Sequence, residues 1–232
     1  MHSECTKVQF TGQHVYVGID VAQRSWKVCI YVGQSYHKRF SQGADPKVLV
    51  EHLHRHFPDA IYHAVYEAGY FGFWIHRELT RLGVHSMVIN PADVPTTDKE
   101  RHTKTDRVDA AKLAWALANG GLRAIYVPER MAEADRMLVR MRATFVCKQT
   151  RTKNQIKAHL RCFGEQLPED ITDRSWSRAY IQWLETRMFQ HESGRAAFQA
   201  LVTELLSLRA TIADLTKRIR ALSQEERYRR RV

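Results

Sequence analysis

Four carboxylates lie where side chains from separate elements could meet. Asp20 closes the run VYVGID and Glu67 closes HAVYE, while Asp106 and Asp109 open KTDRVDAAKLAWAL. Strand ends and helix starts on one rim of an α/β sheet form the crevice where ligands bind. Asp106 and Asp109 are three residues apart, so in a helix they would share one face. The spacing therefore predicts that the four carboxylates converge.

Converging carboxylates beside an apolar core repel one another unless cations neutralise them. Mg²⁺ or Mn²⁺ suits such hard oxygen ligands, and two ions roughly 4 Å apart stabilise the attacking and leaving oxygens of a phosphoryl transfer. We predict a phosphodiester site whose metal ligands and catalytic residues are Asp20, Glu67, Asp106 and Asp109. Taken singly, each carboxylate also has a structural explanation, such as a helix-start Asp favoured by the dipole or a Glu paired with a nearby Arg or Lys.

Three β-rich runs come first in the chain, and helices then alternate with strands. The runs are at 14–22, 25–32 and 35–41; a helix at 45–57, a strand at 60–68, a helix at 72–82 and a strand at 84–90 follow. The run VYVGID is apolar on both faces, as in a central strand covered on both sides. This order predicts an α/β, RNase H-like (RuvC-like) mixed sheet with flanking helices.

A polar loop and a further helix complete the first predicted domain. Residues 91–104 contain two prolines and no hydrophobic period, and a helix over 105–119 then stops at Gly120-Gly121. Residues 122–127 are suggestive of one more strand before Pro128. We place the domain boundary there, with the catalytic domain at 1–128 and a helical region at 129–232.

The hydrophobic pattern of the helical region at 129–232 predicts two long helices, over 133–163 and 173–226, separated by residues 164–172. The second helix carries apolar residues at alternating spacings of three and four, which is typical of a coiled coil. They are Phe198, Leu201, Leu205, Leu208, Ile212, Leu215, Ile219 and Leu222. We expect residues 195–223 to join copies of the chain into a dimer or tetramer; the alternative is an amphipathic helix on a local core.

Charge points to a nucleic-acid partner. The chain has 36 Lys and Arg against 25 Asp and Glu, a net charge of +11, and most of the excess lies after residue 128. Between residues 136 and 161 eight side chains are basic and none is acidic, which indicates phosphate contacts. They are Arg136, Arg140, Arg142, Lys148, Arg151, Lys153, Lys157 and Arg161. Lys99, Arg101, Lys104 and Arg107 lie beside the predicted metal site; charge for solubility is the alternative for each.

Other features of the sequence limit the classes of protein to which the chain can belong. Cys5, Cys29, Cys147 and Cys162 lack zinc-ligand spacing and are interpreted as reduced thiols. No apolar run approaches the ~20 residues of a membrane helix and no signal peptide is evident, so we expect a cytoplasmic chain that does not enter membranes. Trp26, Trp74 and Trp115 lie in apolar patterns and are expected in the core rather than on a base-stacking surface.

Four blocks carry a family resemblance: GIDVAQRSWKVCI, YEAGYFGFWIHREL, VINPADV and KTDRVDAAKLAWAL. They resemble successive signature blocks of the RuvC-like DEDD transposases of bacterial insertion sequences, which include the Piv-type DNA invertases. The resemblance implies the DEDD metal ligands at Asp20, Glu67, Asp106 and Asp109. It also implies DNA strand exchange guided by a structured RNA.

The family continues into a second domain with a Gly-rich segment and a serine thought to be the nucleophile, whereas this chain ends at RYRRRV. We therefore assign no serine that role, and we expect this chain by itself not to complete recombination.

Three alternatives remain at this stage. A stand-alone RuvC-like junction-resolving nuclease would use the same carboxylates. An actin-like or sugar-kinase-type ATPase also opens with a strand ending in Asp, but its phosphate-cradling Gly and Ser or Thr are missing from the turn DVAQRS. A nucleic-acid scaffold with purely structural carboxylates is the third.

Overall fold

The computed structural model describes residues 9–93, 106–167 and 176–229, with the side chains of 106–109 left out. The chain divides into two compact units, Met1–Val127 and Pro128–Val232. We describe each unit by itself.

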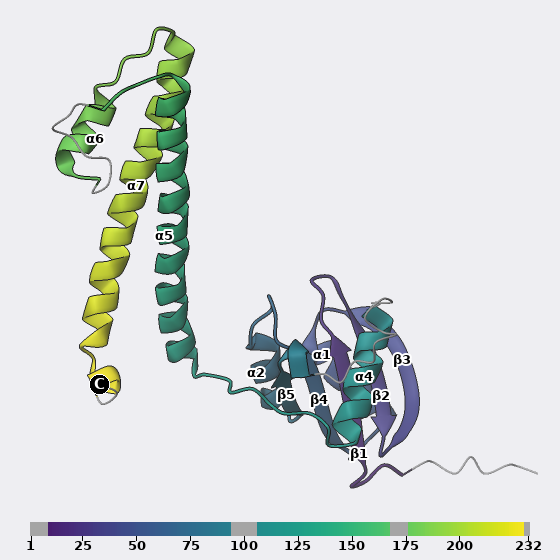
Figure 1. Ribbon diagram of the computed structural model, residues 1–232. Coiled ribbons are helices and arrows are strands. Elements are labelled where there is room, and N and C mark those ends of the chain that lie inside the picture. Colours follow the sequence, from purple (N-terminus) through teal and green to yellow (C-terminus); the bar gives the residue numbers. More distant parts are fainter. Residues whose placement is uncertain (1–8, 94–105, 168–175, 230–232) are drawn as a thin grey trace, which may run out of the picture. The chain divides into compact units, whose positions relative to one another are not determined.

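The first unit is built on a five-stranded mixed sheet in the order β3-β2-β1-β4-β5 (Figure 1). Its strands are β1 (His14–Asp20), β2 (Ser25–Val32), β3 (Ser35–Gly43), β4 (Ile61–Glu67) and β5 (His85–Ile89). The first three strands form an antiparallel meander, and β4 and β5 run parallel to β1. The prediction of an RNase H-like mixed sheet is confirmed.

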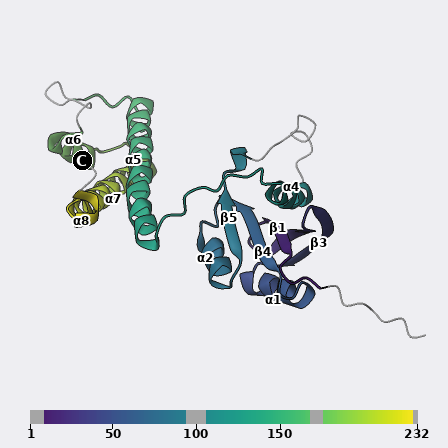
Figure 2. The same ribbon diagram turned by 90° about the horizontal axis from the view of Figure 1, so that it is seen from below.

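Helices cover both faces of this sheet (Figure 2). They are α1 (Pro46–His56), α2 (Trp74–Arg81) and α4 (Asp106–Ala118), and a 3₁₀ turn spans Pro91–Asp93. Because side chains alternate along a strand, Val15, Val17 and Ile19 of β1 face the main core with α1 and α2. The intervening positions, Tyr16 and Gly18, face α4. Helix α1 begins where Asp45 accepts a 2.8 Å hydrogen bond from the amide of Lys47.

Helix α4 lies unusually close to the central strand. A Cβ on Gly18 would overlap the carbonyl oxygen of Ala110 and the amide nitrogen of Ala114. The glycine in VYVGID therefore allows helix and strand backbones to approach closely. Beneath α4, Cys29 packs with Ala110 and Ala114, and Val65 packs with Leu113. Burial raises the pKa of the Cys29 thiol, which keeps that side chain neutral.

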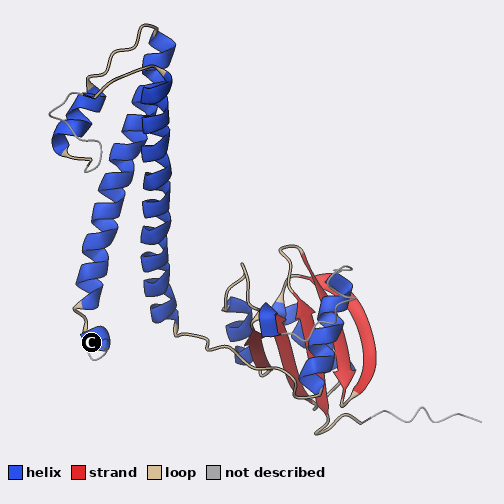
Figure 3. Ribbon diagram, viewed as in Figure 1, coloured by secondary structure: helices blue, strands red, loops and turns tan. Residues whose placement is uncertain are grey.

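The second unit is entirely helical over its described residues, whereas all five strands belong to the first (Figure 3). Its helices are α5 (Arg130–Cys162), α6 (Arg178–Glu185), α7 (Glu192–Ser223) and the single turn α8 (Glu226–Arg229). Helices α5 and α7 lie side by side and run in opposite directions (Figure 1). The end of this hairpin is fastened by Asp135, which accepts from the Tyr228 hydroxyl at 2.8 Å and pairs with Arg227 at 3.0 Å.

The apolar seam predicted on α7 finds its partner within the chain. Phe198, Leu205 and Leu208 are buried, together with Val202, and the rest of the seam is half-buried along α5. Near the α6 end these residues join Ile156, Tyr180 and others in one core. By length and composition alone α7 is also apolar enough to cross a membrane, which the sequence reading missed. Phe198, Val202 and Leu205 of this helix lie in the core of the second unit, with residues of α5 and α6.

Three sequence-based expectations were wrong. The single helix over 173–226 is interrupted: α6 ends at Glu185 and α7 starts at Glu192. The strand expected at 122–127 is reduced to one bridge between Ala124 and Ile89. Trp26 is buried as expected, but Trp74 and Trp115 are 47% and 53% exposed, because they lie on the outer sides of α2 and α4.

The interruption has a tertiary cause. Past α6, the Thr186 hydroxyl and the Arg187 Nε both donate to the carbonyl of Trp183, satisfying the helix end. Phe189 then turns inward, with its ring 5.0 Å from that of Phe198 and 5.2 Å from that of Phe163. The chain therefore leaves the helical path between α6 and α7, where Phe189 packs against Phe163 and Phe198.

Candidate functional site

Asp20 and Glu67 end neighbouring parallel strands. Strands β1 and β4 pair in register up to Ile19 and Tyr66, so the two carboxylates are the next residues of their strands, at the same edge of the sheet. Alternation places both on the α4 face, since Gly18 and Val65 two positions earlier lie under α4. Parallel neighbours are about 4.8 Å apart between strands. Both side chains are half-buried, at the rim of the core.

Helix α4 begins at this same edge. Its middle, at Ala110 and Leu113, packs over Gly18 and Val65, whereas Leu117 near its end reaches His63 and His85 at the starts of β4 and β5. The helix therefore runs from the carboxyl ends of these strands toward their amino ends. Its first residue, Asp106, belongs to the turn nearest Asp20 and Glu67.

The side chains of Asp106, Arg107 and Asp109, and all of Lys99, Arg101 and Lys104, lie outside the described residues. Their predicted roles stay predictions. Among the described side chains, no group of three or more His, Cys, Asp or Glu is gathered as a metal site. The structure thus brings together two of the four carboxylates and the backbone of the helix that carries the other two.

Two further side chains at this edge were missed by the sequence analysis. Lys27 is the register partner of Asp20 on the antiparallel neighbour β2, and its Nζ donates to the Ser41 hydroxyl at 3.1 Å. Tyr70 is fully exposed on the loop that leaves Glu67. The antiparallel pairing of β2 with β1 could have predicted that Lys27 lies opposite Asp20. The position of Tyr70 between Gly69 and Gly72 indicated an exposed loop.

The loop after Glu67 is held in place by Tyr66. Its buried hydroxyl donates to the carbonyl of Gly72 at 3.0 Å and accepts from the amide of His76 at 3.2 Å. Gly72 has a φ of +58°, a left-handed conformation that glycine adopts without strain. The blocks HAVYEA and GYFGFW are therefore joined by a fixed turn, which places Tyr70 at the carboxylate edge.

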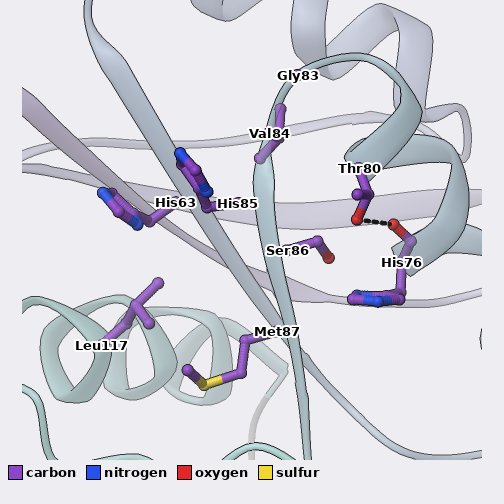
Figure 4. A pocket seen from close by; sticks show the side chains of 9 residues that line it. All are labelled: His63, His76, Thr80, Gly83, Val84, His85, Ser86, Met87 and Leu117. Atoms are coloured by element: carbon purple, nitrogen blue, oxygen red, sulfur yellow. Dashed lines mark hydrogen bonds between the residues drawn. The ribbon is translucent and has the colours of Figure 1, made fainter. Parts of the chain in front are cut away.

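A pocket of about 450 Å³ lies at the opposite end of the strands (Figure 4). Figure 4 shows His63 and His85 on one side of β5 with Met87 and Leu117, and His76, Thr80 and Ser86 on the other. His63 lies four residues before Glu67, about 13 Å along an extended strand. The pocket is therefore separate from the carboxylates.

Imidazole rings dominate this end of the sheet. The His14 Nδ1 and His63 Nε2 are 2.9 Å apart, so one ring donates to the other. Burial, followed by the neighbouring His14 and His85, lowers the pKa of His63, so this ring stays neutral at neutral pH. The pocket thus has little charge and a partly apolar wall, unlike the carboxylate edge.

The eight basic residues predicted on α5 fall into two groups. Five are exposed: Arg136, Arg140, Lys148, Arg151 and Arg161. The other three are half-buried and face the rest of the hairpin: the Arg142 Nε donates to the Thr216 hydroxyl at 2.8 Å, while Lys153 and Lys157 lie over the ring of Trp176. The exposed five form the basic surface of α5.

Comparison with known proteins gives a consistent result. A family model described as "Transposase", of the DEDD type found in IS110 elements, matches residues 17–164, more than half of the chain. The chain is 34% identical over 142 residues to a protein of Sinorhizobium fredii named as a transposase, y4qE, covering 61% of this chain and 35% of that one. It is 25% identical over 226 residues to the transposase for insertion sequence element IS1533 of Leptospira borgpetersenii, covering 94% and 63%.

A third relative, y4rJ of Sinorhizobium fredii, also named as a transposase, is 37% identical over 112 residues, covering 46% of this chain and 28% of that one. The chain thus spans between about a quarter and two thirds of the length of these relatives. The matched segment, residues 17–164, contains the end of β1, the other four strands of the sheet, α4 and α5. The chain belongs to the DEDD transposase family of insertion sequences.

Proposed function

We propose that this chain is the metal-binding part of an insertion-sequence transposase that cleaves and exchanges DNA strands. The observation that carries the proposal is the convergence of Asp20 and Glu67 on one face at one edge of the sheet, where α4 begins at Asp106. Family membership supports DNA as the substrate class.

The donor set fits Mg²⁺ or Mn²⁺. Asp20 and Glu67 offer hard carboxylate oxygens at a half-buried rim, and Asp106 and Asp109 would add two more from α4. When bound, such ions stabilise charge on the oxygens of a phosphodiester undergoing transfer. The chain's own part is to hold the carboxylates on rigid strand ends. Lys27 contributes a positive charge near the DNA phosphate, and Tyr70 an exposed ring beside it.

The nucleic-acid contacts are assigned to the basic surface of α5, and to Lys99, Arg101, Lys104 and Arg107 beside the carboxylates. Lys153 and Lys157 complete the set on α5. We propose a structured guide RNA as a partner besides DNA. The support is the family resemblance, together with a one-sided row of cations on a helix that belongs to a different unit from the carboxylates.

We also propose that copies of the chain associate through the hairpin. Between α5 and α7 the seam at Ile212, Leu215 and Ile219 is only half-covered, and Met137 and Met141 of α5 are 64% and 44% exposed. A second hairpin packed along this stretch would remove that apolar surface from water.

The metal assignment is tested by titrating Mn²⁺ into the chain and following bound ion by electron paramagnetic resonance. Asp20→Asn, Glu67→Gln and the Asp106→Ala/Asp109→Ala variant should each weaken binding at least tenfold, because each removes a charged ligand. Glu51→Gln, which neutralises an exposed carboxylate of α1, is the matched control and should bind as the wild type does. Equal Mn²⁺ affinity in all variants would rule out this site.

A further inference from the structure

Three rings from neighbouring strands form a stacked row near the amino ends of the parallel strands. Tyr16 of β1, His63 of β4 and His85 of β5 are direct partners in the pairing of these strands. The ring of His63 lies 5.0 Å from that of Tyr16 and 5.2 Å from that of His85, with interplanar angles of 23° and 24°. Strand pairing therefore holds three nearly parallel rings in one row on the α4 face of the sheet.

The row is held in its middle and open at one end. His63 is half-buried and shares a 2.9 Å hydrogen bond with the ring of His14. His85 ends the row on β5, the edge strand of the sheet, and its side chain is exposed. Among the rings of the described residues, His63 alone stacks on it. A further planar ring could therefore extend the row beyond His85.

The pocket of about 450 Å³ beside His85 offers room for such a ring (Figure 4). Its volume lies within the range of roughly 300–1,000 Å³ that is typical of small-molecule sites. Met87 and Leu117 lie on the same side of β5 as His85 and give the pocket an apolar wall. None of the nine described residues that line it is Asp, Glu, Lys or Arg. The pocket therefore suits a flat, uncharged group better than a phosphate.

Polar groups along β5 could recognise the rim of that ring. The carbonyl of Val88 points away from β4 and accepts from the amide of Ile125 at 2.8 Å, so the amide of Ser86, two residues earlier, points to the same edge. The Ser86 hydroxyl and the His76 Nδ1 are buried and lack a hydrogen-bond partner among the described residues. Burial, followed by Arg77, lowers the pKa of His76, so its ring is neutral at neutral pH and keeps an acceptor nitrogen. A heterocycle with donors and acceptors fits these groups.

We propose that this pocket binds one unpaired nucleobase, which stacks on His85 and extends the row of rings formed with His63 and Tyr16. The inference rests on the proposed nucleic-acid function and adds a contact outside the carboxylates and the basic surface of α5. A nucleobase is planar and uncharged, and it carries donors and acceptors on its edge. The base must be unpaired, because a base within a duplex already stacks on its neighbours and pairs through its edge.

The contribution of the base can be separated from that of the phosphates. Removal of a side chain on which a base stacks weakens binding about 5- to 100-fold per base. A hairpin in which an abasic sugar replaces the unpaired nucleotide keeps every phosphate and lacks only the base. The ratio of the affinities for the two hairpins therefore reports the base contact, whatever the phosphates contribute.

The test measures this ratio for the full chain by fluorescence anisotropy, with hairpins that carry either one unpaired adenine or an abasic sugar. The wild-type chain should prefer the adenine hairpin about 5- to 100-fold. His85→Ala should bind both hairpins equally, whereas His85→Phe, which retains a ring, should keep the preference. Tyr36→Ala is the control and should also keep it, because Tyr36 is an exposed ring on the opposite edge strand, β3, and meets Tyr31 edge-on.

The outcomes separate the inference from the proposed function. If the wild-type chain binds both hairpins equally, the base site is wrong while the nucleic-acid function stands. If it binds neither hairpin, both are wrong. If His85→Ala keeps the preference, or His85→Phe loses it as His85→Ala does, the base does not stack on this row. Each pair of hairpins is made as DNA and as RNA, and a preference in one form only supports the site and identifies which nucleic acid supplies the base.

A second measurement uses the unaltered protein, so it does not depend on how a variant folds. A photoactivatable adenine at the unpaired position should crosslink to the peptide that contains His85 and Met87, as mapped by mass spectrometry. The abasic hairpin, with the same photoactivatable adenine moved into its paired stem, should not label that peptide. Crosslinks that lie outside the pocket residues would overturn the assignment.

Discussion

The close approach of α4 to β1 predicts that Gly18→Ala disturbs both stability and the candidate metal site. The added methyl would overlap the carbonyl oxygen of Ala110 and the amide nitrogen of Ala114. Both obstacles are backbone atoms, so no side-chain rotation relieves the clash. The helix itself must move away from the strand.

The expected cost follows from overpacking. Forcing extra volume into a packed core destabilises a protein by about 1–3 kcal/mol. Gly18→Ala should lie in the upper part of that range, because the contact involves two backbone groups of the same helix turn. The control is Gly43→Ala, at the end of β3, where an added Cβ meets nothing within 4 Å. Its free energy of unfolding should stay within about 0.5 kcal/mol of the wild-type value.

Two assays report the two consequences. Urea unfolding followed by circular dichroism gives the free energy of unfolding of each variant. Mn²⁺ titration under native conditions should show weaker binding in Gly18→Ala, because displacement of α4 moves its first turn away from Asp20 and Glu67. If Gly18→Ala is as stable as Gly43→Ala, the contact between helix and strand is looser than the structure indicates. If it is less stable but binds Mn²⁺ normally, α4 does not help to form the metal site.

Two further predictions concern pH and association. The pKa of His52 is lowered to about 4 by burial, and then by neighbours that include Lys38 and His56, so the unfolded chain binds a proton there more readily than the folded chain as pH falls below 6.5. The contribution of the neutral His52 ring to the free energy of unfolding is therefore complete above pH 6.5, and it is lost as the pH falls toward 4. His52→Phe should reduce that acid-dependent loss by about 1 kcal/mol after solvent screening, measured by urea unfolding across this range. The same loss in the variant and the wild type would contradict this role of His52. Met137→Glu/Met141→Glu should give monomers by sedimentation if copies associate along the open stretch of the hairpin. Ala143→Glu, at an exposed position on a different face of α5, is the control, and an unchanged mass of the double variant would exclude that stretch.

The order of elements in the first unit could be predicted because local patterns and packing agree there. Alternating apolar residues specify the strands, and Asp45-Pro46 specifies the start of α1. The position of Gly120-Gly121 likewise predicts the end of α4. The position of Asp20 and Glu67 at one edge could also be predicted, because each residue ends a strand and neighbouring parallel strands end at the same edge of a sheet.

The features that were missed depend on contacts far apart in the sequence. No proline lies between residues 173 and 226, and the interruption before α7 instead follows from Phe189 packing on Phe163 and Phe198. The heptad seam of α7 was visible in the sequence, but its partner was not, because the face of α5 toward α7 mixes polar and apolar residues: Thr152 is buried beside Ile156, and Arg142 donates to Thr216. The division of basic residues on α5 into exposed and half-buried sets likewise depends on Trp176 and Thr216, which are distant in the sequence.

The mixed direction of the strands explains how one edge can hold both the carboxylates that we propose as metal ligands and a lysine. Parallel pairing of β1 with β4 brings together two strand ends, each closing on a carboxylate. Antiparallel pairing of β1 with β2 brings the start of β2 to the same edge, and Lys27 opposite Asp20 supplies a cation there. A fully parallel sheet would place only strand ends at this edge. The antiparallel meander therefore places Lys27 beside Asp20 in the sheet, where its charge would reduce the repulsion between the carboxylates and the proposed DNA substrate.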